Sequence, residues 1–91
     1  MKKSTAAKVT ALVVKHVSAP ASPLVLRQFP GSHEGLSDDS LVLWREDGDY
    51  STGHDYWVEA AAANAALTTD LRAMGLFVEP VHAESIAVCK I

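Results

Sequence analysis

Apolar residues recur at helical spacing through the second half of the chain. From Tyr56 to Met74 there is no proline or glycine, alanine dominates, and Gly75 follows where a left-handed residue commonly ends a helix. This pattern predicts one long helix of ~28 Å, capped by preceding side-chain oxygens, with one apolar stripe facing a sheet. The expected cap residues are Ser51, Thr52 and Asp55, and the expected stripe is Tyr56, Ala60, Ala63, Leu67, Leu71 and Met74.

Strand patterns precede this helix. Residues 8–17 are rich in β-branched side chains and apolar on both sides, which favours an interior strand. Residues 41–46 form a second apolar run. Asp47-Gly48 directly after it is a hairpin signal, which predicts a short return strand over 49–52.

The segment between these strands leaves two readings open. Residues 24–29 fit a strand, which we favour, or a short helix with Ser22 as N-cap and Pro23 in the first helical position. From 30 to 40, glycine, serine and acidic residues predict a long loop.

The end of the chain reads as two more strands. Residues 76–81 and 85–91 are rich in β-branched side chains and are separated by His82-Ala83-Glu84. Together the elements predict an α+β fold in two layers, with a mainly antiparallel sheet of four or five strands and the long helix on one face. We expect a single domain over 1–91, with residues 1–7 a frayed basic start and the second sheet face partly bare.

Charge is distributed unevenly along the chain. Net charge is −3, yet residues 1–33 hold five bases and no acid, whereas residues 34–91 hold eleven acids and three bases. The densest acidic stretch runs from Glu34 to Asp55. Because non-specific nucleic-acid binding requires a basic surface that releases counterions, direct binding to nucleic acid is disfavoured.

Hydropathy and cysteine usage bound the setting. The longest apolar runs have four or five residues, far short of the ~20 that span a bilayer, so no membrane partner is expected. The single cysteine, Cys89, lies in an apolar strand pattern and is expected to be a buried small side chain. A chain of this size without paired cysteines fits a reducing cytoplasm.

Candidate chemistry is sparse. Three histidines lie beside acids, at His33-Glu34, His54-Asp55 and His82-Ala83-Glu84, but the nearest pair of histidines is seventeen residues apart. Metal sites usually show paired ligands two to five residues apart, so no metal is expected. Neither a nucleophile elbow nor a phosphate-binding glycine loop is present, and no cofactor is expected. These features favour a non-catalytic role.

Three functional hypotheses remain. We favour a protein-interaction or regulatory module, expected to be a homodimer, that binds a protein partner through an acidic surface containing aromatic residues. Small alanine side chains on the helix allow close approach either of the sheet beneath or of a second copy. A second hypothesis is a small-ligand site or small enzyme between helix and sheet, with His54 and Asp55 at its mouth. A third is an acidic mimic of nucleic acid. Trp57 fits two roles equally well: an exposed residue of the interaction surface, or a side chain that covers the edge of the sheet. The expected interaction surface comprises Glu34, Asp38, Asp39, Trp44, Asp49, Tyr50 and Trp57, and the alanines are Ala61, Ala62, Ala65 and Ala66.

Overall fold

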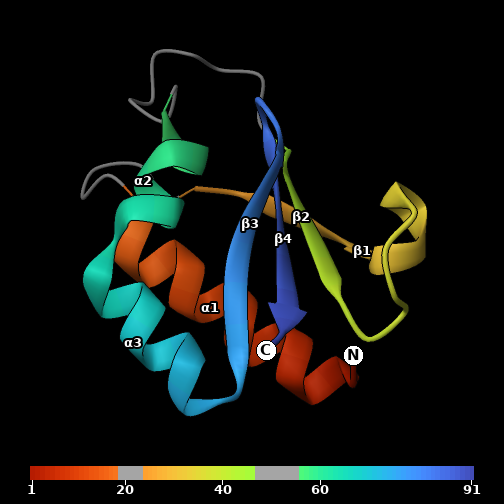
Figure 1. The fold of residues 1–91 in the computed structure, drawn as a ribbon. Coiled ribbons are helices and arrows are strands. Elements are labelled where there is room, and N and C mark those ends of the chain that lie inside the picture. The colour runs from red at the N-terminus through yellow and green to blue at the C-terminus, as the bar shows by residue number, and fades with distance from the viewer. Residues whose placement is uncertain (19–23, 47–55) are drawn as a thin grey trace.

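The fold is an antiparallel sheet packed against helices. The computed structural model describes residues 1–18, 24–46 and 56–91, which form three α-helices, one 3-10 helix and four strands (Figure 1). In chain order these are α1 (Lys3–Val17), β1 (Leu26–Pro30), η1 (Gly31–Glu34), β2 (Leu41–Arg45), α2 (Trp57–Ala63), α3 (Ala65–Ala73), β3 (Leu76–His82) and β4 (Ser85–Lys90). The predicted α+β class is confirmed.

All strand pairs are antiparallel, and the order across the sheet is β1-β2-β4-β3. The sheet of the described residues has four strands, which agrees with the predicted four or five. The strands predicted at 41–46, 76–81 and 85–91 are confirmed, and the last two are joined by a turn at Ala83 and Glu84. Gly75 has a φ of 75°, as predicted for the residue after a helix.

The strand reading of residues 24–29 is also confirmed, because β1 begins at Leu26 and pairs with β2. Ser22 and Pro23, which the alternative reading required, lie outside the described residues. The same holds for Asp47-Gly48 and the return strand expected at 49–52.

The strand predicted at 8–17 is wrong, because α1 spans these residues and begins at Lys3, within the segment expected to be frayed. Its buried residues are Ala6, Val9 and Val13, which share one side of a helix. A run that is apolar on both sides fits a buried helix as well as a buried strand. A β-branched residue in a helix costs only about 0.7 kcal/mol or less relative to alanine. Because this cost is small, packing against the rest of the chain determines whether the segment forms a helix or a strand.

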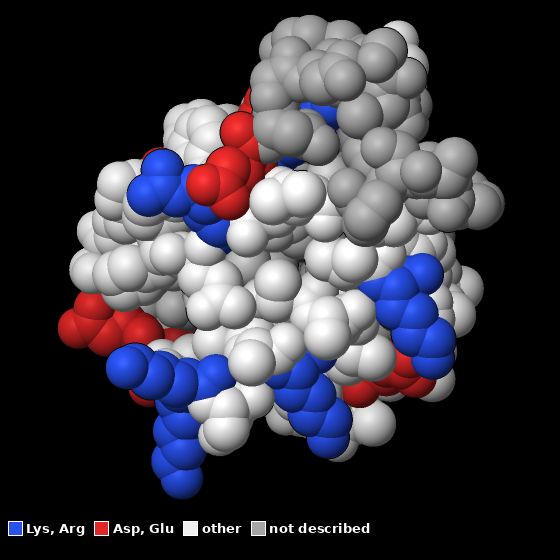
Figure 2. All heavy atoms as spheres, turned by 180° about the vertical axis from the view of Figure 1, so that it is seen from behind, with Lys and Arg blue, Asp and Glu red and all other residues white. Residues whose placement is uncertain are grey.

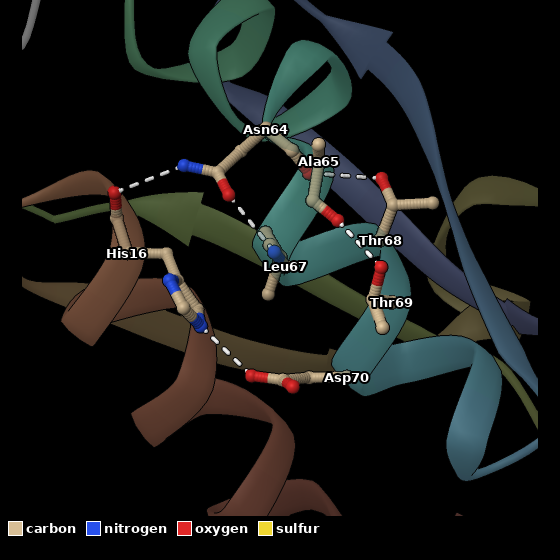
Figure 3. Close-up of polar contacts among 7 residues, drawn as sticks. All are labelled: His16, Asn64, Ala65, Leu67, Thr68, Thr69 and Asp70. Atoms are coloured by element: carbon tan, nitrogen blue, oxygen red, sulfur yellow. Dashed lines mark hydrogen bonds and ion pairs between the residues drawn. The ribbon is translucent and has the colours of Figure 1, made fainter.

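The single long helix is also wrong, because Asn64 separates α2 from α3. Asn64 has an extended backbone with ψ 109°, and its side-chain oxygen accepts a hydrogen bond of 2.8 Å from the Leu67 N–H. Its amide nitrogen donates to the carbonyl of His16 at 3.3 Å, so the residue also fastens α3 to the end of α1 (Figure 3). Beside it, His16 Nε2 lies 2.9 Å from Asp70. Asparagine favours such caps over helix interiors.

This break changes which residues face the core. A continuous helix would place Ala61 and Leu67 about 120° apart around its axis, yet both are fully buried. In α2 the buried residues are Trp57, Val58 and Ala61, whereas Tyr56 of the expected stripe is 76% exposed. The stripe was therefore wrong in its first half and right for Leu67, Leu71 and Met74. The expected caps Ser51, Thr52 and Asp55 lie outside the described residues.

Removing the Asn64 side chain should destabilise the contact between helices. Asn64→Ala loses the cap on α3 and the bond to His16, so we expect the free energy of unfolding to fall by about 1–2 kcal/mol. Thr69→Ala is the matched control, because its exposed hydroxyl only donates to Ala65 within the same helix, and a change within about 0.5 kcal/mol is expected. Urea unfolding measures both. Equal losses would show that Asn64 does not act as a cap.

The helices lie on one side of the sheet, where one apolar cluster joins them to the strands (Figure 1). On the other side of the sheet lies η1, which touches strand residues there, so the expected arrangement in two simple layers is not confirmed. Cys89 is buried, as predicted. None of the helices in the described ranges has the length and apolarity to cross a bilayer.

Candidate functional site

The sheet face opposite the helices carries the chemically distinctive side chains. Directly paired residues of antiparallel strands point to the same face, and Phe29 pairs with Val42, which pairs with Ala87. Trp44 and His82 both pair with Ser85 and share that face. Val42, Ala87 and Ser85 are fully buried but lie outside the helix-side core cluster. Other side chains must therefore cover them on this face.

Part of this cover comes from η1, which reaches across the sheet. The His33 ring stacks on Phe29 with centroids 4.6 Å apart and planes 19° apart. Next to it, the Glu34 carboxylate accepts a 2.9 Å hydrogen bond from Nε2 of His82, the last residue of β3. The His82 ring in turn lies 5.2 Å from Trp44. We call Phe29, His33, Trp44 and His82 the aromatic face.

Glycines allow the chain to turn tightly enough to place η1 there. Gly31 is buried and donates to the carbonyl of Ser40 at 2.9 Å, which continues the pairing of β1 with β2 by one step. Gly35 ends η1 with a φ of 71°, a left-handed conformation that glycine adopts without steric cost. The turn between them presents His33 and Glu34 to the sheet.

A hollow of about 320 Å³ opens at one side of the aromatic face. Arg27 lies at this hollow with its guanidinium carbon 5.4 Å from the centre of the Phe29 ring, a cation–π geometry. Its Nε is 3.9 Å from Glu46, and both side chains are more than half exposed. The lining residues are Arg27, Phe29, His33, Trp44, Arg45 and Glu46.

A second hollow, of about 250 Å³, lies where the start of α1 meets β1 and the loop before β2. It is lined in part by Met1, Lys3, Gln28 and Asp38, and the amino group of Met1 donates to the Asp38 carbonyl at 2.9 Å. Neither hollow lies between the α2–α3 pair and the sheet, where the small-ligand hypothesis expected one. Its anchors, His54 and Asp55, are outside the described residues.

The expected interaction surface is only partly assembled. Glu34 and Trp44 meet through His82, whereas the exposed Asp38 and Asp39 lie in the loop after η1. Trp57 is 2% exposed and packs in the helix-side core, so its assignment to an exposed surface was wrong and the alternative of a covering role is nearer the structure. The two remaining members, Asp49 and Tyr50, fall outside the part of the chain that the structure describes.

Most carboxylates in the described ranges have a basic partner. Figure 2 shows the acidic side chains of one face in small separate groups among basic and uncharged atoms. This pairing weakens the picture of an open acidic surface, because the positive charge of a neighbouring lysine or arginine lowers the field of Asp39, Glu46 and Glu84. The pairs are Glu34 with His82, Asp39 with Lys90, Glu46 with Arg27, Asp70 with His16, and Glu84 with Arg45.

The arrangement offers little for catalysis. Ser85 is the strand partner of His82, which bonds Glu34, so the three residue types of a hydrolytic triad lie near one another. However, Ser85 is fully buried and its Oγ has no hydrogen-bond partner, so it is neither activated nor reachable as a nucleophile. Within the described ranges, no group of three or more His, Cys, Asp or Glu is placed to hold a metal ion.

Sequence reasoning missed the aromatic face. It treated His33-Glu34 and His82-Ala83-Glu84 as local doublets, but the contact that forms joins Glu34 to His82 across 48 positions. No spacing along the chain marks such a pair, because it depends on the path of η1 across the sheet. Comparison with protein-family models, with curated proteins and with solved structures finds no match for this chain.

Proposed function

We propose that this chain is a non-catalytic protein-interaction module that binds its partner through the aromatic face. The observation that carries the proposal is the hollow beside that face, which is lined by Phe29, His33, Trp44 and Arg27 among others. Aromatic side chains and arginine are enriched at the centres of protein interfaces, because they bury a large area and lose little conformational freedom. The other sheet face offers no comparable surface, since the helices cover it.

The acidic surface favoured from the sequence is a weaker basis for partner binding. Glu34 contacts His82, and the charges of Lys90 and Arg27 offset part of the charge of the exposed Asp39 and Glu46, which lowers the attraction of these carboxylates for a basic protein. A mimic of nucleic acid needs a row of such free charges, so the same pairing counts against it. Asp38 and Asp39 keep a role in the proposal as exposed neighbours of η1.

A homodimer remains part of the proposal. The outer sides of α2 and α3 expose small side chains that allow close approach of a second copy. Sheet extension is a poor route, because the edge strands β1 and β3 contain Pro30 and Pro80, which lack the N–H that a ladder needs. Sedimentation equilibrium of the purified chain tests the state directly. The exposed alanines are Ala60, Ala62, Ala63, Ala65 and Ala66.

Substitutions at Arg27 and His33, which line the hollow at the aromatic face, should reduce the amount of partner that the chain captures. Arg27 and His33 are exposed, so Arg27→Glu and His33→Ala are expected to fold normally but to retain at least about fivefold less partner than the wild type. The measurement is quantitative affinity capture, with circular dichroism to confirm folding. Lys8→Glu, an equally exposed charge reversal on α1, is the matched control and should capture normally.

Two outcomes of this capture experiment would contradict the proposal. If Lys8→Glu reduces capture as much as Arg27→Glu, the surface is not confined to the aromatic face. If Asp38→Lys with Asp39→Lys abolishes capture while Arg27→Glu and His33→Ala do not, the binding surface is the acidic loop that the sequence suggested.

A further inference from the structure

The hollow at the aromatic face has a composition that restricts its occupant. At about 320 Å³ it lies at the small end of ligand sites, which suits one large side chain with its flanking group rather than an extended cofactor. Phe29, His33 and Trp44 line it, and contact with their planar side chains favours a planar or bulky apolar group. The apolar part of the occupant is therefore set by these rings.

The polar part is set by Arg27. Its guanidinium makes no hydrogen bond within the described chain; it contacts Glu46 only at 3.9 Å, beyond hydrogen-bond range, and it is 61% exposed. Such a surface ion pair is weak. A guanidinium presents a planar fork of N–H donors that matches a carboxylate with two parallel hydrogen bonds. An incoming carboxylate can therefore accept hydrogen bonds from the guanidinium N–H groups of Arg27, which Glu46 does not bind.

Charge around the hollow agrees with this choice. Arg45 also lines it, but its side chain is only 2% exposed and lies 3.8 Å from Glu84, so we assign it no part in holding a ligand. A cationic ligand would gain from Glu46 but would be opposed by Arg27, whose guanidinium lies over the Phe29 ring. Complementarity thus favours a negative group at Arg27 with an apolar body among the rings.

We infer that the hollow binds a partner segment in which a carboxylate lies beside an aromatic or large apolar side chain. This inference rests on the proposed function and names the chemistry of its partner. Arg27 holds the carboxylate, and Phe29, His33 and Trp44 enclose the apolar group.

Three matched probes test the inference on the intact chain by two-dimensional NMR titration. The probes are 2-naphthoate, 2-naphthalenemethanol and 2-naphthylmethylammonium, which share a ring system and differ in charge. We expect 2-naphthoate to shift the signals of Phe29, His33 and the Trp44 indole with a Kd about tenfold lower than that of the alcohol. Arg27→Gln should remove this tenfold preference, whereas Arg72→Gln, an exposed arginine on α3, should leave it unchanged.

The outcomes separate this inference from the proposed function. Equal binding of all three probes at these residues, or tighter binding of the ammonium compound, overturns the carboxylate assignment while leaving the aromatic face as the binding surface. No shift with 2-naphthoate, combined with loss of partner capture by Arg27→Glu, overturns the inference alone. No shift and unaffected capture overturn both.

Discussion

Replacing Trp57 with alanine is expected to lower the free energy of unfolding by about 3–5 kcal/mol, the largest effect of any substitution considered for this chain. Trp57 is 2% exposed and packs in the cluster that joins the helices to the sheet. Its removal leaves a cavity that a domain of this size has little means of collapsing. Thermal or urea unfolding, followed by far-ultraviolet circular dichroism, measures the loss.

The neighbouring Tyr56 provides the control. The sequence pattern predicted that Tyr56 is buried and Trp57 exposed, whereas the structure buries Trp57 and exposes Tyr56. Tyr56 is 76% exposed, so Tyr56→Ala should change the free energy of unfolding by no more than about 0.5 kcal/mol. A large loss for Tyr56→Ala with a small loss for Trp57→Ala would mean that the helix faces the sheet in the phase the sequence suggested.

Adding a methyl group at Gly31 should have the second largest effect. A β-carbon there would overlap the carbonyl oxygen of Ser37 and lie 2.8 Å from the β-carbon of Ser40, so the turn cannot close around it. We expect Gly31→Ala to lower the free energy of unfolding by about 3 kcal/mol, at the upper end of the usual cost of overpacking. Because this turn carries η1, the stacking of His33 on Phe29 should be lost with it.

Gly35→Ala separates steric overlap from loss of backbone freedom in the same turn. Gly35 has a φ of 71° and open space where a β-carbon would lie, so only the left-handed conformation opposes the substitution, at about 1–2 kcal/mol. Urea unfolding compares the two variants, and the NMR signals of His33 and Phe29 report the stacking. A Gly31→Ala variant as stable as the wild type would show that η1 does not close as described.

Local patterns along the chain identified most of the strands. β2, β3 and β4 alternate or run continuously apolar between turn residues, and such segments carry their own signal. The same signal failed at residues 8–17, where Val9 and Val13 fit an interior strand and a buried helix equally well. Only the available packing surface distinguishes these two, and that surface is built by other parts of the chain.

The site was less accessible to sequence reasoning than the fold. The sequence analysis selected Trp44 and Glu34 for their residue types. Their neighbours on the aromatic face, Phe29 and His82, come from the two edge strands, β1 and β3. The acidic stretch suggested an open charged surface. Among the described members of that stretch, Glu34, Asp39 and Glu46 each lie beside a basic residue distant in sequence. A count of acidic residues along the chain therefore does not give the net charge of the folded surface, because basic residues from distant segments lie beside them.

The sequence by itself determined the α+β class, the antiparallel strands after residue 40 and the helix end at Gly75, because each depends on spacing or backbone chemistry within a few residues. Only the tertiary structure decided that residues 3–17 form a helix, that Asn64 divides the next one, and that Trp57 rather than Tyr56 is buried. It also decided the aromatic face. These features arise from contacts between distant segments, whose burial free energy outweighs local preferences of a few tenths of a kcal/mol per residue.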